Sequence, residues 1–358
     1  MGGFVIKNSY AIWNNKGGVG KSTITFNVAS RFAELNEDKH VLVIDMCPQA
    51  NVSMMLLGGG LKGEAEVHKL CTSAAAPTIV GYLTQALGGG PLANAPMAAT
   101  YVTNVSAINT SLPKNLHLIC GDPNLELISA YISNLASAQQ VLPTIKPWVW
   151  VHEVVKRLIS SVDKELGGEW VVFIDTNPSF SSYTELAICA VERLLLPVNA
   201  DDSSRTAIGA MHSLLYGQNP PHPIYGAWTF AHNAQAYGVS VPKIHQVIGN
   251  RLTQNLGAAA AFAALSRASA ESLYGLYKGN PGRFTVRAQA PTNENDFVIK
   301  YSVSLRDFNT AGVVAAHEGV PVSSLHGGRH FVHGREVNID NNRIVDCRIA
   351  LDLVVKSV

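Results

Sequence analysis

The sequence is short of charge. Charged side chains make up 15% of its 358 residues, 27 Lys or Arg against 26 Asp or Glu, where a soluble globular domain usually carries about 25%. A formal net charge of +1 excludes a general attraction to polyanions, so any nucleic-acid contact must come from a local patch. Apolar residues reach 47%, which excludes disorder along the whole chain and suffices for the core of one large domain.

The sequence also lacks paired cysteines and long apolar runs. Its five cysteines are scattered and form no C-x-x-C pair, so we expect neither a disulfide framework nor a structural zinc site. No stretch approaches the roughly 20 consecutive apolar residues of a transmembrane helix, and the first residues show no apolar signal-peptide core. We therefore expect a cytoplasmic protein with free thiols. The cysteines are Cys47, Cys71, Cys120, Cys189 and Cys347.

What the sequence does contain is an alternation of apolar β-branched runs and amphipathic segments. The run VLVID at 41–45 is typical of a parallel sheet that is covered on both faces. Segments of helix length separate such runs, which predicts an α/β fold with a doubly wound, mostly parallel sheet flanked by helices. We expect strands at 9–13, 41–45, 170–175, 194–198, 244–252 and 297–303, and helices at 23–35, 152–166, 183–193, 258–277 and 309–319.

The stretch from about 58 to 147 is less regular. GGG occurs twice within it, and Pro, Ala and Ser are common. A helix at 78–87 and a short strand at 115–121 are its recognisable elements. Because the chain has no internal repeat, charge block or long linker, we expect a single domain over 1–358 with a loosely structured segment at about 58–147.

The strongest local signal is the Gly-rich run NKGGVGKS at 15–22, between the first strand and the first helix. Its glycines let the backbone curl so that successive N–H groups point inward, and the start of the helix adds partial positive charge. This arrangement suits phosphate, with Lys21 reaching the β and γ oxygens and the Ser22 hydroxyl on Mg²⁺. An ordinary tight turn is the alternative. The expected nucleotide-binding residues of this run are Lys16, Gly17, Gly18, Val19, Gly20, Lys21, Ser22 and Thr23.

The run departs from the general G-x-x-x-x-G-K-[ST] pattern at its first position, which is Asn15 followed by Lys16. KGGVGKST resembles the deviant Walker A signature of the ParA/MinD family of ATPases. The similarity continues through VLVIDMCPQANVS, NLHLICGDPNLELIS, VVFIDTNPSF and SLRDFNTAGVVAAHEGVPV. The resemblance implies a P-loop fold and an ATP-dependent homodimer in which Lys16 reaches the nucleotide of the partner subunit. A solvated surface lysine is the alternative.

The same resemblance implies further site residues. Asp175, at the end of an apolar strand, takes the Walker B position and would hold a water on Mg²⁺. Asp45, at the end of the neighbouring strand, would help to order the metal shell and the loop; for either, capping the next helix is the alternative. Asn250 matches the family position that reads the adenine edge. An Asn at a strand end is also a common turn residue, which is the alternative. The expected metal site is Ser22, Asp45 and Asp175, and the expected catalytic residues are Lys16, Lys21, Asp45 and Asp175.

One position departs from the family in a way that affects catalysis. The family's second motif carries two acidic residues, whereas here the second is Cys47. A neutral thiol does not orient or deprotonate water as a carboxylate does, and lost base assistance costs about 10² to 10⁴ in rate. A thiolate beside a triphosphate is electrostatically disfavoured, so we expect a protonated Cys47. The hypothesis is that the protein binds ATP and dimerises but hydrolyses ATP slowly, or that another group supplies the water contact.

Weaker signals have competing interpretations. The spacing of His326, His330 and His333 suits a metal, but a Gly-rich polar loop explains them as well. The C-terminal segment 343–358 carries acids as well as bases, so we expect it to pack on the body rather than to bind a membrane. Dispersed basic residues in the C-terminal half suit either non-specific DNA, as the resemblance implies, or a solvated surface. They are Arg251, Lys278, Arg283, Arg287, Lys300 and Arg306.

The function that the resemblance implies is a switch driven by ATP and Mg²⁺. An ATP-bound homodimer would hold non-specific DNA, and a ParB-like or other protein would stimulate hydrolysis, in support of DNA partition or cargo positioning. Cys47 favours a second hypothesis, a hydrolysis-impaired scaffold gated by ATP. A third hypothesis, a membrane-positioning ATPase of MinD type, requires lipid binding by the C-terminal helix.

Overall fold

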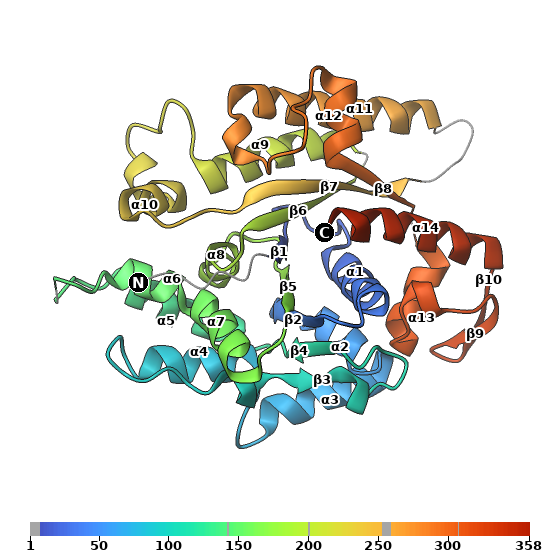
Figure 1. Cartoon of the computed structure of the whole chain (residues 1–358), viewed down its shortest axis with the longest axis horizontal. Coiled ribbons are helices and arrows are strands. Elements are labelled where there is room, and N and C mark those ends of the chain that lie inside the picture. Colours follow the sequence, from blue (N-terminus) through green and yellow to red (C-terminus); the bar gives the residue numbers. More distant parts are fainter. Residues whose placement is uncertain (1–7, 142, 200, 253–258, 307) are drawn as a thin grey trace.

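A central sheet with helices on both faces organises the molecule (Figure 1). The computed structural model describes residues 8–141, 143–199, 201–252, 259–306 and 308–358. The strands in this part of the chain are β1 (Ser9–Ile12), β2 (His40–Met46), β3 (Thr103–Asn104), β4 (Leu116–Ile119), β5 (Trp170–Thr176), β6 (Arg193–Asn199), β7 (Lys243–Leu252), β8 (Ser302–Arg306), β9 (Gly328–Val332) and β10 (Arg335–Ile339). The α-helices are α1 (Lys21–Leu35), α2 (Asn51–Leu56), α3 (Gly60–Thr72), α4 (Ile79–Gly88), α5 (Leu125–Ala136), α6 (Pro147–His152), α7 (Val154–Leu166), α8 (Ser182–Cys189), α9 (Asp202–Tyr216), α10 (Phe230–Tyr237), α11 (Ala259–Gly279), α12 (Glu294–Tyr301), α13 (Asn309–Glu318) and α14 (Asn341–Ser357).

The large sheet has the strand order β3-β4-β2-β5-β1-β6-β7-β8. Its neighbouring strands are parallel except for the pair β3 and β4. β9 and β10 form a separate antiparallel hairpin. Parallel neighbours need crossover connections, and the helices supply them. The expected doubly wound, mostly parallel α/β fold is confirmed.

Strand β1 shows why both faces of the sheet are covered. Successive side chains of a strand point to opposite faces, and here both sets are buried and apolar except for Ser9. Tyr10 and Ile12 belong to the core beneath α1, α13 and α14. Ala11 belongs to the core on the other face, beneath α4, α7 and α8. Figure 1 shows α1, α13 and α14 on one side of the sheet and α7 and α8 on the other.

The segment between 58 and 147 is more regular than expected. It contains α3, α4, β4 and α5, and β4 pairs with β2 in the large sheet. The first GGG run allows two backbones to meet, since a Cβ at Gly59 would lie 2.3 Å from the backbone nitrogen of Gly319. Close packing against the end of α13, rather than looseness, explains these glycines.

The expected strand at 297–303 is wrong in its first part. Residues 294–301 form α12, and β8 begins only at Ser302. The Asn293 side chain caps this helix by accepting a hydrogen bond from the Asp296 amide at 2.9 Å. Phe297 and Tyr301, four residues apart, are both buried on one helical face. A short apolar run fits both the strand period and the helix period, and the Asn293 cap favours the helix here.

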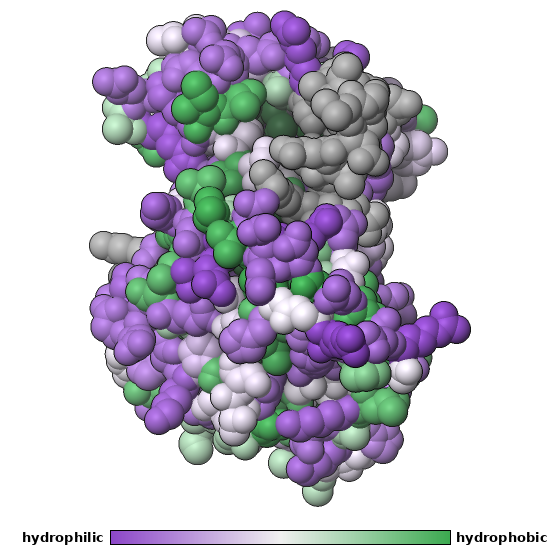
Figure 2. Space-filling model, turned by 90° about the vertical axis from the view of Figure 1, so that its right-hand side faces the viewer, coloured by the Kyte–Doolittle hydropathy of each residue, from purple (hydrophilic) through white to green (hydrophobic). Residues whose placement is uncertain are grey.

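The C-terminal helix α14 packs on the body of the molecule, as expected. Cys347, Leu351 and Val354 on its inner face are fully buried. Its outer face carries Ile349 and Leu353, which are 57% and 51% exposed. Figure 2 shows that hydrophobic residues lie among hydrophilic ones on this side of the molecule. Among the described residues, no helix is long and apolar enough to cross a membrane.

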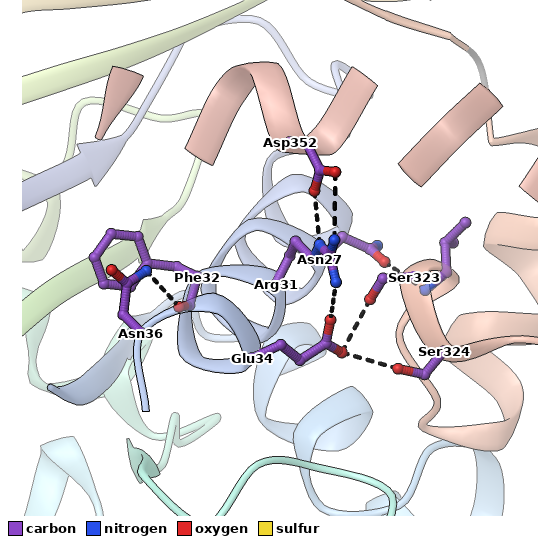
Figure 3. A network of polar contacts seen from close by, with 9 residues as sticks. Asn27, Arg31, Phe32, Glu34, Asn36, Ser323, Ser324 and Asp352 are labelled. Carbon is purple, nitrogen blue, oxygen red and sulfur yellow. Dashed lines mark hydrogen bonds and ion pairs between the residues drawn. The ribbon is translucent and has the colours of Figure 1, made fainter. Parts of the chain in front are cut away.

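A polar network joins α1 to the C-terminal part of the chain (Figure 3). Arg31 on α1 donates to both carboxylate oxygens of Asp352 on α14, at 2.7 and 3.3 Å, and to Glu34 at 2.9 Å. Glu34 accepts hydrogen bonds from the hydroxyls of Ser323 and Ser324 at 3.0 and 2.8 Å. The network therefore holds α1, the helix that follows the Gly-rich loop, against α14. It also holds α1 against the turn that precedes the β9–β10 hairpin.

We predict that Asp352→Asn lowers the free energy of unfolding by about 1 to 2 kcal/mol, because Arg31 loses its bidentate charged partner at a site where the side chains are only 17% and 30% exposed. Urea unfolding measures the change. Glu37→Gln, at an exposed acid beyond the end of α1, is the matched control and should stay within about 0.5 kcal/mol. Equal effects of the two substitutions would contradict the prediction.

Candidate functional site

The Gly-rich loop lies where β1 ends and α1 begins, which confirms its expected place between a strand and a helix. Gly18 and Gly20 have left-handed backbones, with φ of 72° and 80°, a region that L side chains rarely adopt. At Gly20 a Cβ would also come within 2.4 Å of Asn250 Nδ2. Both positions therefore require glycine.

The side chain of Lys21 turns back into its own loop. Its Nζ donates to the backbone oxygens of Asn14 at 3.1 Å and of Lys16 at 3.0 Å. Burial lowers the pKa of Lys21 to about 8, although the nearby Asp175 counteracts this shift. A buried ammonium group beside the backbone N–H groups of a helix start is a strong partner for an anion. The loop therefore has the chemistry of a phosphate site.

Asp45 and Asp175 lie side by side at the ends of neighbouring strands. The register of β2 and β5 pairs the two residues, and both are fully buried. Asp175 accepts a hydrogen bond from Ser22 Oγ at 2.6 Å. Asp45 accepts from the amides of Cys47 and Ser53 at 3.0 and 3.1 Å, and from the Ser53 hydroxyl at 2.7 Å. Asp175 is thus tied to the start of α1, and Asp45 to the loop after β2.

Two adjacent buried carboxylates favour a cation. Burial raises the pKa of both carboxyl groups, and the Asp45 charge raises the pKa of Asp175 further. Carboxylate and hydroxyl oxygens are ligands that Mg²⁺ prefers. Ser22 and Asp175, already in contact, together with Asp45 fit the magnesium site that the sequence predicts. A divalent cation there would hold both carboxylates ionised.

Cys47 is buried beside the same carboxylates. Burial, followed by the charges of Asp45 and Asp175, raises the pKa of the thiol to about 12. The thiol is therefore neutral, as expected, and it lines the cavity that also contains Lys21 and Ser22. A neutral thiol at this position offers water neither a base nor a strong hydrogen-bond acceptor.

Lys16 contacts its own subunit in this structure. Its Nζ forms an ion pair with Asp201, the residue that precedes α9. The two side chains are 22% and 42% exposed, and an ion pair so open to water contributes about 0 to 1 kcal/mol. Replacing the Asp201 carboxylate by a phosphate as the partner of Lys16 therefore costs little free energy.

A cavity of about 880 Å³ opens above the loop, a volume that suits a nucleotide-sized ligand. The Gly-rich loop and the start of α1 form one end, and α2 and α13 form the walls. Asn250, at the end of β7, lines the cavity, and its Nδ2 donates to the backbone oxygen of Val19 at 2.9 Å. Asn250 thus supports the loop; its reading of the adenine edge stays a prediction.

The sequence matches the family described as AAA domain over residues 7–215. The chain belongs to this family. The match spans more than half of the chain and includes the Gly-rich loop, Asp45 and Asp175. Together with the fold, it confirms the recognition of a ParA/MinD-like P-loop ATPase from the sequence.

Solved structures share the fold of this family member. The McdA(D38A)–ATP complex of Cyanothece matches 99% of this chain and 96% of its own, with a TM-score of 0.59 and 16% identity. A putative plasmid partition protein of Borrelia burgdorferi B31 bound to AMPPNP matches over 98% and 99%, with a TM-score of 0.53 and 14% identity. Identities this low establish the fold alone. No curated protein matches the sequence of the chain.

The C-terminal histidines do not form a metal site. Among the residues that the structure describes, no cluster of three His, Cys, Asp or Glu side chains suits a metal ion. His330 lies in β9 and contacts Glu318 Oε1 through Nδ1 at 2.8 Å and the backbone oxygen of His326 through Nε2 at 2.9 Å. His333 lies in the turn between β9 and β10. The segment that the sequence suggests as a polar loop is therefore a hairpin.

Several of the basic residues considered for DNA are used inside the molecule. Arg283 donates to His212 Nε2 at 2.8 Å. Arg287 donates to the backbone oxygen of Lys300 at 3.1 Å, and Lys300 pairs with Asp296 at 2.9 Å. Each of these contacts holds a basic group to a neighbouring element. The same groups are therefore less available to phosphates than free surface cations.

The other basic candidates divide into two kinds. Lys278 is exposed, and its Nζ lies 5.0 Å from the ring centre of Tyr274, a position that leaves it open to an anionic partner. The side chains of Arg251 and Arg306 lie outside those that the structure describes. A shared DNA-binding face for the six residues stays a prediction.

Some contacts of the site depend on the fold and are not predicted by the sequence motifs. Thr25 Oγ1 donates to Asp175 at 3.0 Å. The position of Thr25 one turn after Ser22 on α1 indicates that both lie on the same helix face. Ser53 holds Asp45, and Asp201 holds Lys16. The last contact joins residues 185 positions apart, so only the parallel order of β1 and β6 brings them together.

We predict that His212 makes the protein sensitive to acid. Burial, then the Arg283 charge, lowers its pKa from 6.5 to about 4. Between these values the unfolded chain binds a proton that the folded chain does not, so stability falls as the pH drops from about 6.5 to 4. His212→Gln keeps an acceptor for Arg283 but does not titrate. The difference in unfolding free energy between wild type and variant, measured in urea, should shrink or reverse over this range.

The exposed His68 on α3 supplies the control for that experiment. His68→Gln should leave the pH dependence of the unfolding free energy close to that of the wild type. A His212→Gln difference that stays constant from pH 7 to 4.5 would show that His212 does not carry the effect.

Proposed function

We propose that the chain is an ATP-dependent switch that binds ATP and Mg²⁺, dimerises with ATP and hydrolyses it slowly. One observation carries the proposal: Lys21 and Ser22 of the Gly-rich loop meet Asp45 and Asp175 at adjacent strand ends. Ammonium, backbone N–H groups, a hydroxyl and buried carboxylates together suit a magnesium nucleotide. The family match supports this chemistry.

The reaction would transfer the γ-phosphoryl group of ATP to water. The loop N–H groups and Lys21 would stabilise charge that develops on the phosphate oxygens. Ser22, Asp45 and Asp175 would hold Mg²⁺, which would supply positive charge that stabilises the phosphate oxygens. Catalysis in this scheme arises from positioning and electrostatics, since the described site offers the attacking water no free carboxylate.

Lys16 would complete the active site of the partner subunit. In the single chain its ammonium pairs with Asp201. The weakness of that solvent-open pair supports an exchange in which the phosphates of the partner's nucleotide replace the carboxylate. Dimerisation would then depend on the triphosphate itself.

For cargo and regulation we propose DNA and an activating protein of ParB type. The support is the partition protein of Borrelia burgdorferi, which has a similar fold, and the exposed Lys278. Because the net charge is +1, the chain needs a composite surface from two subunits to hold a polyanion. DNA binding should therefore appear only in the dimer.

A second function, an ATP-gated scaffold that barely hydrolyses ATP, is favoured by Cys47. The thiol is buried and neutral beside the carboxylates. If no partner supplies a group for the water, ATP stays bound and the dimer persists. The two functions differ in phosphate release, with and without DNA and partner, rather than in ATP binding.

We predict that ATP converts a monomer into a dimer and that Lys16→Ala abolishes the conversion, because the second subunit loses its contact with the phosphates. Size-exclusion chromatography with light scattering in ATP, ADP and no nucleotide measures this. Lys39→Ala, at a lysine that pairs with Glu169 at 3.0 Å away from the loop, should dimerise like the wild type. A Lys16→Ala variant that still dimerises with ATP would overturn the role of Lys16.

We predict that Cys47→Asp raises steady-state ATP turnover by about 10- to 100-fold, because a carboxylate can orient the attacking water where a thiol cannot. Phosphate release measures the rate. Cys47→Ser, a neutral control of similar size, should leave the rate near that of the wild type. If ATP binds equally to all three proteins and the rates agree, Cys47 does not limit hydrolysis.

A further inference from the structure

A second cavity lies at the amino ends of the strands, whereas the Gly-rich loop lies at their carboxyl ends. Its volume is about 610 Å³, enough for a small-molecule ligand. Ser9, Arg193 and Lys243 line it and begin the neighbouring parallel strands β1, β6 and β7. The seven residues of β6 span about 20 Å. The two cavities are therefore separate sites.

The lining of this second cavity carries more basic than acidic groups. Its basic residues are Lys156, Arg193 and Lys243, and its acid is Glu192, which is exposed. Lys156 Nζ lies 3.7 Å from a carboxylate oxygen of Glu153. Arg193 and Lys243 form no ion pair with an acid in the part of the chain that the structure describes. Buried charges are usually paired, so an unpaired, half-buried arginine favours an anionic ligand.

The guanidinium group of Arg193 is held in place by neutral groups. Its Nη1 donates to the Tyr10 hydroxyl at 2.5 Å and to Asn8 Oδ1 at 3.5 Å, and its Cζ lies 5.4 Å from the centre of the Tyr10 ring. A guanidinium has five N–H donors, and among the described residues these bonds use Nη1 alone. Nε and Nη2 are left for an anion, which a guanidinium binds through two parallel hydrogen bonds.

A second arginine adds to the positive potential at this cavity. Arg287 donates to the backbone oxygen of Lys300 at 3.1 Å and to the side-chain oxygen of Gln246 at 3.2 Å, so its charge is not neutralised by these partners. Burial lowers the pKa of His245, which lines the cavity, to about 4, and the charges of Arg287 and Arg193 contribute to this shift. The potential of both arginines therefore reaches the cavity wall, where a bound anion would be stabilised.

Hydroxyl and apolar groups complete the lining. Ser240 and Thr285 contribute hydroxyls, and Ile159, Val191 and Val241 contribute apolar side chains. Phosphate oxygens accept hydrogen bonds from guanidinium, ammonium and hydroxyl groups, whereas the apolar side chains suit an uncharged remainder of the ligand. This combination is typical of a site for a small organic molecule that carries a phosphate group.

We propose that this cavity is a second ligand site, which binds a small phosphate-bearing molecule with Arg193 and Lys243 on the phosphate group. β6 is an interior strand of the sheet, and Arg193 is half-buried at its start. A group that reaches Arg193 must therefore enter the cavity, which a small ligand does more readily than the backbone of a DNA duplex. The site is independent of the Gly-rich loop and of the function proposed for that loop.

Inorganic pyrophosphate is the probe, and calorimetry measures its dissociation constant. Because pyrophosphate also suits the Gly-rich loop, the titrations use Lys21→Ala as the background, in which the second site should remain. Arg193→Gln in this background should raise the dissociation constant about 10- to 100-fold, since a charged bidentate donor is lost. Lys243→Gln, at an exposed residue that the fold does not need, should raise it about 2- to 5-fold.

Lys114→Gln is the matched control, since this exposed lysine precedes β4 at the same end of the sheet and does not line the cavity. It should bind pyrophosphate like the background. A Lys21→Ala protein that binds no pyrophosphate would overturn the inference, as would equal affinities in the Arg193→Gln, Lys243→Gln and Lys114→Gln proteins. Displacement of pyrophosphate by a DNA duplex or by phosphatidylglycerol vesicles, at equal phosphate concentration, would assign these groups to a polyanion surface and would also overturn the small-ligand site.

Discussion

The burial of two carboxylates side by side is the constraint on which the rest of the site depends. Asp45 and Asp175 are adjacent because β2 and β5 are parallel and in register, and neither is reached by solvent. Their charges are stabilised by hydrogen bonds from Ser22 and Ser53 and by the nearby Lys21. A parallel sheet that carried these groups without a cation and a polar loop would lose stability. The Gly-rich loop is thus both ligand site and structural necessity.

The sequence predicts the parts of this site that local patterns encode. The loop between β1 and α1, and the aspartates that end β2 and β5, follow from motif and strand pattern. The contacts of Lys16 with Asp201 and of His317 with His333 join residues of different elements. They depend on strand order and on the hairpin, which no local pattern reveals. The strand expected at 297–303, part of which is α12, was wrong for another reason. A short apolar run fits the period of a helix as well as that of a strand.

The fold also connects the site to the far end of the chain. α1 starts at Lys21 and, almost three turns later, presents Arg31 to Asp352 on α14. α13 lines the same cavity as the loop and ends against Gly59, close to the hairpin that His330 anchors. The cavity therefore has one wall from the first half of the chain and one from the last. A ligand that fills it would bring these two halves into a single cooperative unit.

The charge shortage of the sequence has a physical meaning at this site. Lys16 forms a weak, solvent-exposed ion pair with Asp201, so another anion that lies close to Lys16 can replace that carboxylate. Cys47 is neutral, so this position offers no carboxylate that could activate water. In the proposed switch, the missing carboxylate would slow hydrolysis and would also remove a negative charge next to the triphosphate, which favours ATP binding. Under the same proposal, the rate of the switch would depend on the group that a partner adds to the site.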